Sequence, residues 1–140
     1  MLKSLDPLLT GKLLAILADM GHGDELVLVD ANFPAAALAQ RLVELPGQGA
    51  TAVLQAVLSV FPLDDFVEQP AAVMQAPDHL PAIYNEFTTL IHDGEGRAIT
   101  LEPIDRFAFY DRARAAYAVV ATGERRLYGN IILKKGVVRA

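Results

Sequence analysis

Short apolar runs that alternate with segments of helical spacing are the feature that most constrains the fold of this chain. Leu26–Val29 is an unbroken run of leucine and valine, which is typical of a strand buried on both faces of a sheet. A strand of that kind needs helices on each side of the sheet. Further strands are predicted at Ala71–Gln75, Ile99–Ile104, Tyr117–Thr122 and Ile131–Lys135, and Arg41–Leu45 fits a strand or a helix.

The segments between these runs predict helices. Leu13, Leu17 and Met20 share one face of a helix over about residues 7–20, and Gly21 follows as its end. Other helices are predicted as a short turn after Pro34, from a Thr51 cap to Pro62, over Asp78–His92, and from an Asp105 cap through Ala116. Strands alternating with helices predict an α/β fold, a three-layer α/β/α arrangement with a mostly parallel central sheet. Residues 1–140 are expected to form a single domain.

Composition narrows the possible partners. Of the 140 residues 53% are apolar, enough for one core with apolar surface to spare, which favours a homo-oligomer. The net charge is −5 and the basic residues form no stripe with interleaved aromatics, which argues against binding to nucleic acid.

The chain has no cysteine, so disulfides and thiolate sites are excluded. Lys12, Asp19 and Asp24 interrupt the apolar N-terminal residues, so no signal peptide or membrane span is predicted and the cytoplasm is the expected compartment.

The first candidate for chemistry is the turn Gly21-His22-Gly23-Asp24, which leads into the strand Leu26–Val29. Glycines on both sides let the imidazole stand clear of its neighbours. Histidine has an unperturbed pKa close to neutral, which suits it to donate and accept protons. On these residues alone, a solvated surface histidine is the simpler interpretation.

Three further segments place polar groups where strands and helices begin or end. Asp30 closes a buried strand, where open α/β sheets hold ligand-binding residues; it could equally cap the turn before Pro34. Arg106 opens an aromatic-rich helix and could be solvated or ion-paired. Tyr128-Gly129-Asn130 leads into the last strand. Its hydroxyl and amide suit a polyhydroxyl ligand, although a hairpin turn would use the same residues.

Other chemistries lack their motifs. His22, His79 and His92 lie far apart without ligand pairing, so no metal site is predicted. Gly21-His22-Gly23 has no third glycine and precedes a strand rather than a helix, so no nucleotide cofactor is predicted. No Gly-x-Ser-x-Gly elbow or other nucleophile–base pair is present.

Four segments taken together resemble one family. They are Met20–Asp24, Asp30–Pro34, Arg106–Tyr110, and Thr122–Glu124 with Tyr128–Gly136. Their order and spacing are similar to those of the ribose pyranase and fucose mutarotase (RbsD/FucU) family, and specifically to its fucose branch. The likeness runs from the first helix to the last strand, except for residues 66–97, where little matches.

The resemblance implies an RbsD-like fold and a cofactor-independent cytosolic isomerase that interconverts the anomers of a fucose-like monosaccharide. It also implies a ring-shaped homo-oligomer, often a decamer. The family's proton-donating histidine falls on His22. Its sugar contacts fall on Asp30, Arg106, Tyr128, Gly129 and Asn130. A non-catalytic monosaccharide-binding or transport-associated protein is the alternative.

Two positions bear on the preferred sugar. Ribose pyranases carry a histidine where this chain has Arg106, which disfavours a ribose-type pyranase. Fucose-branch members often read Asp-Ala-His-Phe-Pro, whereas this chain has Asn32 in place of that histidine. Asparagine keeps hydrogen-bonding capacity but does not titrate, so the identity of the sugar stays open.

Asp24, Asp64 and Tyr110 are further candidates for assisting the proton transfer.

The spacing of His22 and Asp30 makes a prediction about assembly. The two residues are eight positions apart, or up to ~26 Å in an extended chain, which exceeds the length of a monosaccharide. Either the turn folds His22 back beside the strand, or a neighbouring subunit completes the pocket. We expect the site to lie at or beside a subunit interface.

Overall fold

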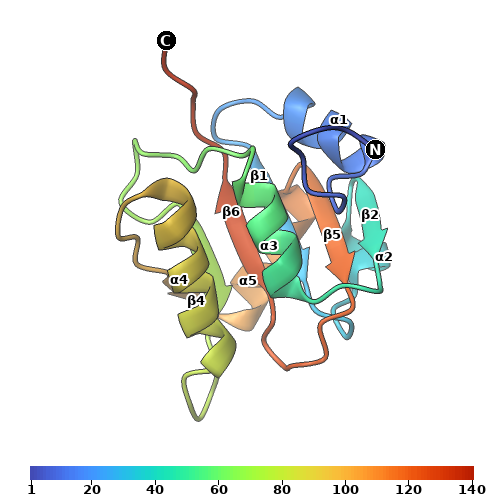
Figure 1. Cartoon of the computed structure of the whole chain (residues 1–140). Helices are drawn as coiled ribbons and strands as arrows, with labels where there is room; N and C mark the ends of the chain where they lie inside the picture. The colour runs from blue at the N-terminus through green and yellow to red at the C-terminus, as the bar shows by residue number, and fades with distance from the viewer.

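A six-stranded sheet forms the centre of the protein in the computed structural model, which describes all of residues 1–140 (Figure 1). The strands lie in the order β2-β5-β1-β6-β3-β4. Five of them share one direction, and β6 runs antiparallel to both of its neighbours. The mostly parallel sheet is therefore confirmed. The strands are β1 (Glu25–Val29), β2 (Leu42–Leu45), β3 (Ala71–Met74), β4 (Glu102–Ile104), β5 (Ala118–Thr122) and β6 (Ile131–Lys134).

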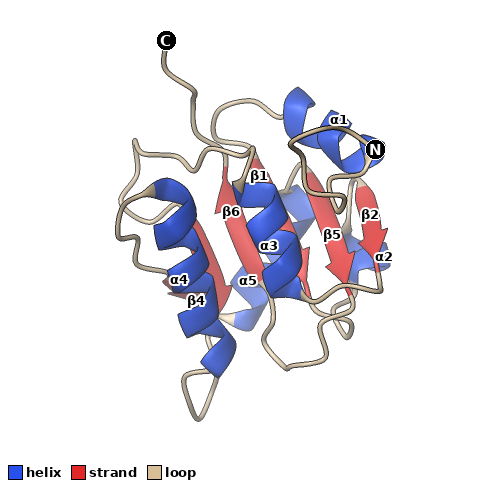
Figure 2. Ribbon diagram, viewed as in Figure 1, coloured by secondary structure: helices blue, strands red, loops and turns tan.

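Helices cover both faces of the sheet, with α3 and α4 in front and α5 behind in the view of Figure 2. Along β1, Leu26 and Leu28 pack into the core beneath α1, α3 and α4, whereas Val27 and Val29 pack into the core beneath α5. All four side chains are fully buried, and each such burial stabilises the fold by about 1.5–3 kcal/mol. The predicted three-layer arrangement is confirmed. The helices are α1 (Gly11–Asp19), α2 (Ala35–Leu38), α3 (Ala50–Leu58), α4 (Ala82–Glu95) and α5 (Arg106–Ala115).

Several predicted boundaries shift for local reasons. Helix α1 begins at Gly11 because the Thr10 side chain accepts a hydrogen bond from the Leu13 N–H. Helix α4 begins after Pro81, later than predicted, and ends at Gly96, whose φ of 70° is left-handed. His79 therefore lies outside that helix. The ambiguous segment at residues 41–45 is a strand, because Leu42–Leu45 pairs with β5.

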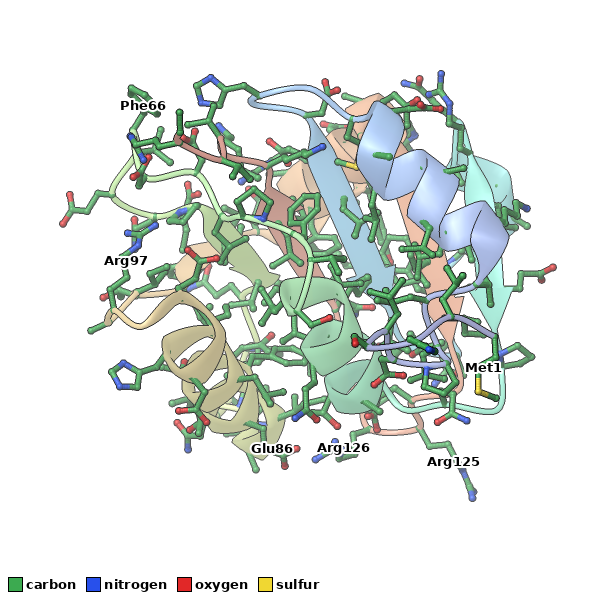
Figure 3. The ribbon with its side chains drawn as sticks, turned by 45° about the horizontal axis from the view of Figure 1, so that its top comes forward. Met1, Phe66, Glu86, Arg97, Arg125 and Arg126 are labelled. Atoms are coloured by element: carbon green, nitrogen blue, oxygen red, sulfur yellow. The ribbon has the colours of Figure 1, made fainter.

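The predicted Thr51 cap is wrong, because α3 begins at Ala50 and Thr51 lies inside its first turn. A distant residue supplies the acceptor instead: Glu124 Oε2 accepts from the Ala50 N–H at 3.3 Å. The same carboxylate accepts from the backbone N–H of Arg126 at 3.0 Å and from its Nε at 3.0 Å. Arg126 in turn contacts Glu86 on α4, with Nη1 and Oε1 2.6 Å apart (Figure 3). The loop before β6 is thus tied to two helices.

The direction of β6 decides which residues meet at each end of β1. Glu25 pairs with Lys134 and Leu28 pairs with Ile131, so the residue before β6 lies beside the residue after β1. The loop from β5 to β6 therefore lies at the opposite end of the strands from the segment that joins α1 to β1 (Figure 1). No helix combines the length and the apolar character needed to span a membrane.

Glu124 gives the fold a specific dependence on pH. Its hydrogen bonds from the Arg126 side chain lower the pKa of its carboxyl from 4.5 to about 2, against the opposing effect of burial. Because the folded-state pKa lies below the unfolded value, the carboxylate stabilises the fold fully above pH 4.5, and this contribution is lost as the pH falls toward 2.

We therefore predict that Glu124→Gln lowers the free energy of unfolding by about 1–3 kcal/mol at pH 7. The difference from wild type shrinks between pH 4.5 and pH 2, as measured by urea denaturation across that range. Glu44→Gln, at an exposed position on β2, is the matched control and changes stability little. A difference that stays constant as the pH falls would contradict the assignment.

Candidate sugar site and proton-transfer pair

A cavity of about 210 Å³, lined by both polar and apolar side chains, opens where β1 ends and β6 begins. It brings together four of the predicted sugar contacts from three separate segments of the chain: Asp30, Arg106, Tyr128 and Asn130. The remaining lining residues are Asn32, Phe33, Met74, Tyr110 and Leu127. The carboxyl ends of parallel strands are where α/β sheets bind ligands, and β1 ends at this cavity.

Asp30 and Asn130 hold each other in place at the base of the cavity. The Asp30 N–H donates to Asn130 Oδ1 at 2.8 Å, and Asn130 Nδ2 donates to Asp30 Oδ2 at 2.9 Å. The other carboxylate oxygen accepts from the Asn32 N–H at 2.9 Å, so Asp30 also caps the turn, which is the alternative role that the sequence left open. Both side chains are buried. Their oxygens keep unused lone pairs, and their orientation is set before any ligand arrives.

The loop that carries Tyr128 and Gly129 needs an unusual backbone. Tyr128 has a φ of 63°, in the left-handed region that few residues other than glycine adopt. A Cβ on Gly129 would lie 2.6 Å from Cγ of Glu124 and 3.4 Å from Cβ of Asp30. Gly129 thus offers no side chain to a ligand, and its role is to let the loop close onto Asp30. Tyr128 is left half-buried beside the cavity.

Arg106 is placed by the start of α5. The Asp105 carboxylate accepts from the N–H groups of Phe107 and Ala108 at 3.0 Å each, which caps the helix as predicted. Arg106 Nε donates to the Tyr110 hydroxyl at 3.0 Å, one helical turn away. Tyr110 also lines the cavity, and its i,i+4 spacing from Arg106 is a signal that sequence reasoning could have used. The Nη1 and Nη2 groups of Arg106 are left to contact a ligand.

His22 lies at the other end of β1. Its turn is fixed by the Gly23 N–H, which donates to the Lys135 carbonyl at 2.8 Å, and by the Asp24 carboxylate, which accepts from the Gly21 N–H at 2.7 Å. Gly23 has a φ of 87°, so this turn needs glycine. Asp24 therefore holds the backbone of the turn and does not contact the imidazole.

The partner of His22 is Asp64. His22 Nε2 and Asp64 Oδ1 are 3.0 Å apart, and the side chains are 44% and 4% exposed, respectively. Burial alone would raise the pKa of the Asp64 carboxyl. Hydrogen bonds from the Phe66 N–H and from His22, together with the positive charges of His22 and Lys134, outweigh burial and lower that pKa.

An ionised Asp64 fixes the tautomer of His22. Because the carboxylate only accepts hydrogen bonds, Nε2 must carry its proton, and Nδ1 of the neutral imidazole is free to accept one. An exposed, oriented nitrogen of this kind can take a proton and return it. The two residues are 42 positions apart, and no local pattern in the sequence links them.

The single chain does not bring His22 to the cavity. Asp30 follows β1 and His22 precedes it, and the five residues of β1 span roughly 17 Å. His22 instead borders an apolar groove of about 450 Å³ between α1 and the C-terminal segment. Of the two possibilities left by the sequence, folding of the turn back beside the strand is therefore wrong.

The other histidines have different surroundings. His79 and His92 line a groove of about 710 Å³ along α4 and the β4 edge, which contains none of the predicted site residues. The structure contains no group of three or more His, Asp or Glu side chains arranged to hold a metal ion.

Comparisons with known proteins identify the family of the chain. The RbsD / FucU transport protein family matches residues 3–138, which includes the region where the motifs showed little likeness. The L-fucose mutarotase of Glaesserella parasuis is 49% identical and covers 98% of this chain and 96% of its own length. The fucose mutarotase of Streptococcus pneumoniae, solved in complex with L-fucose, has a TM-score of 0.94 and 40% identity, covering 99% of this chain and 100% of that one.

A solved structure from the other branch supports the fold alone. RbsD of Bacillus subtilis, complexed with D-ribose, has a TM-score of 0.74 at 24% identity, covering 99% of this chain and 100% of that one. The similarity extends over nearly the full length of the chain, and the identity to the fucose mutarotases is higher than the identity to RbsD. The chain belongs to the RbsD / FucU transport protein family, in its fucose mutarotase branch.

Proposed function

We propose that this protein is an L-fucose mutarotase, an isomerase that interconverts the α and β pyranose anomers without a cofactor, with residues 1–140 acting as one domain. The observation that carries the proposal is the convergence of Asp30, Arg106, Tyr128 and Asn130 on one cavity. The similarity to L-fucose mutarotases over almost the whole chain supports it.

The cavity offers the groups that a sugar needs. Asp30 presents carboxylate oxygens that accept from hydroxyls, and Arg106 presents N–H groups that donate to them. The Tyr128 hydroxyl can do both. A cavity of about 210 Å³ suits one monosaccharide. These contacts hold the sugar so that its anomeric carbon faces a fixed direction.

The His22–Asp64 pair supplies the proton chemistry. Protonated His22 gives the Nδ1 proton to the ring oxygen O5, and the C1 hydroxyl gives its proton to solvent water. The C1–O5 bond breaks as the C1–O1 bond becomes the carbonyl of the open-chain aldehyde. Rotation about C1–C2 presents the other face of the carbonyl. Closure reverses each transfer, so no proton is consumed. Asp64 acts as a positioning residue that orients the imidazole and stabilises its charged form. A protein that only bound sugar would not need this pair.

The distance between His22 and the cavity supports a site shared between subunits. Each end of β1 carries exposed apolar surface: Phe66 is 66% exposed beside His22, and Leu127 is 67% exposed at the rim of the cavity. If the His22 end of β1 in one subunit contacts the cavity end of β1 in the next, both side chains are buried. Because the two surfaces differ, the contact is head-to-tail, and it closes into a ring where the rotation between successive subunits divides a full turn. We therefore propose a ring-shaped homo-oligomer, with the decamer of the family as its expected size.

Asn32 lines the cavity, so the replacement of the histidine common in the fucose branch alters its polar lining. The exchange rates of L-fucose, ribose, galactose and rhamnose, compared side by side, establish the preferred sugar. A ribose preference would favour the pyranase alternative.

Replacing His22 tests the acid–base role. His22→Ala is expected to lower the rate of L-fucose anomer exchange by about 10²–10⁴-fold, because proton transfer to O5 loses its donor. Saturation-transfer NMR between the two anomeric protons measures the rate. His79→Ala, an exposed histidine away from the site, is the matched control and keeps the wild-type rate. Tight sugar binding by a wild-type protein that does not accelerate exchange would favour the non-catalytic binder.

Mixing two inactive variants tests the shared site. His22→Ala removes the proton donor, and Arg106→Ala removes a sugar contact from the cavity at the opposite end of β1. If each site combines His22 of one subunit with the cavity of the next, random reassembly of equal amounts restores about one quarter of the wild-type rate. Anomer exchange is measured before and after dissociation and reassembly. A mixture no faster than the sum of the two variants would show that each site belongs to one chain.

A further inference from the structure

Phe66 is an exposed aromatic residue placed directly beside the proton-transfer pair. It lies in the loop between α3 and β3 and projects at the margin of the molecule (Figure 3). Its ring centroid is 5.0 Å from that of His22, with the two planes at 47°. Large aromatic side chains are normally buried, and Phe66 is 66% exposed. Its ring is therefore open to a ligand that approaches the His22 imidazole.

Phe66 is held in this position by contacts on its backbone and its ring. Its N–H donates to Asp64 Oδ1 at 3.0 Å, the same oxygen that pairs with His22. The Arg139 guanidinium lies 5.3 Å from the ring centroid and is itself bound to Asp65, with Nη2 and Oδ1 3.0 Å apart. The backbone of Phe66 and the imidazole of His22 are therefore both held by the same oxygen of the Asp64 carboxylate.

The proposed reaction brings the sugar within reach of this ring. A pyranose whose O5 lies at hydrogen-bond distance from His22, about 3 Å, has its neighbouring carbons within contact distance of an aromatic ring whose centroid is 5.0 Å away. The face of an aromatic ring is electron-rich and attracts the positive edges of C–H groups. In L-fucose the axial 4-hydroxyl leaves the hydrogens on C3, C4 and C5 together on one face. That face is an apolar patch that fits an aromatic ring.

We propose that Phe66 is a specificity-determining residue whose ring packs against the C3–C4–C5 face of L-fucose while His22 acts on O5. The inference rests on the proposed mutarotase function. With the sugar held in the cavity of the adjacent subunit, Phe66 reaches it across the interface. The C4 epimer, 6-deoxy-L-glucose, turns its 4-hydroxyl equatorial and loses the continuous C–H patch, so Phe66 favours L-fucose over it.

Three variants of the full-length protein test this role. Phe66→Leu keeps an apolar side chain but removes the aromatic face, Phe66→Tyr keeps the face, and Val67→Ala shortens a neighbouring exposed apolar side chain. For each variant, NMR exchange rates over a range of concentrations give KM and kcat for L-fucose and for 6-deoxy-L-glucose. Light scattering reports the oligomeric state.

Phe66→Leu is expected to raise KM for L-fucose about three- to tenfold, with a smaller change in kcat, and to reduce the preference over the C4 epimer by a similar factor. Phe66→Tyr and Val67→Ala keep the wild-type preference. An active wild type whose Phe66→Leu variant keeps the same preference overturns this inference alone. An equal loss for both sugars with a smaller oligomer also overturns it, because Phe66 would then serve assembly only. A wild type that does not accelerate L-fucose exchange overturns the proposed function, and this inference with it.

Discussion

The antiparallel pairing of β6 with β1 determines where the polar residues of this protein meet. Because the two strands run in opposite directions, Asn130 before β6 lies beside Asp30 after β1, and the two side chains form a reciprocal hydrogen-bonded pair. The same pairing brings Lys135 to the turn that carries His22. A parallel β6 would place Asn130 at the beginning of β1 and leave the buried Asp30 without this partner, at a cost of about 1–3 kcal/mol.

Both ends of β1 are held rigid by interactions with distant parts of the chain. At the cavity end, Glu124 ties the loop of Tyr128 to α3 and to Arg126. At the other end, Lys135 Nζ donates to the carbonyl of Leu17 at 2.7 Å, where α1 ends. A site whose groups are held before the ligand binds loses less entropy on binding and keeps reacting atoms aligned. The cavity proposed to bind the sugar and the His22–Asp64 pair proposed to transfer the proton thus lie at opposite ends of β1.

The sequence predicted the layers of the fold better than the contacts of the site. The apolar run at Leu26–Val29 predicted a strand covered on both faces, and its alternate side chains do enter two different cores. The Thr51 cap was wrong because Glu124, 74 positions from Ala50, supplies the acceptor. Asp64 could be named only as one candidate, since its contact with His22 depends on how the loop after α3 pairs with the end of β6. Local patterns report secondary structure, whereas such pairs depend on topology.

A structure of the assembled protein with L-fucose would show whether the site is divided between His22 at one end of β1 and the cavity at the other. The measurement is the distance from His22 Nδ1 to O5 of a sugar held by Asp30 and Asn130. We predict a hydrogen-bond distance of about 3 Å, with His22 contributed by the subunit adjacent to the one that supplies the cavity. A sugar bound in the cavity with no His22 of any subunit within reach of O5, or with His22 of the same chain there, would contradict a site shared between subunits.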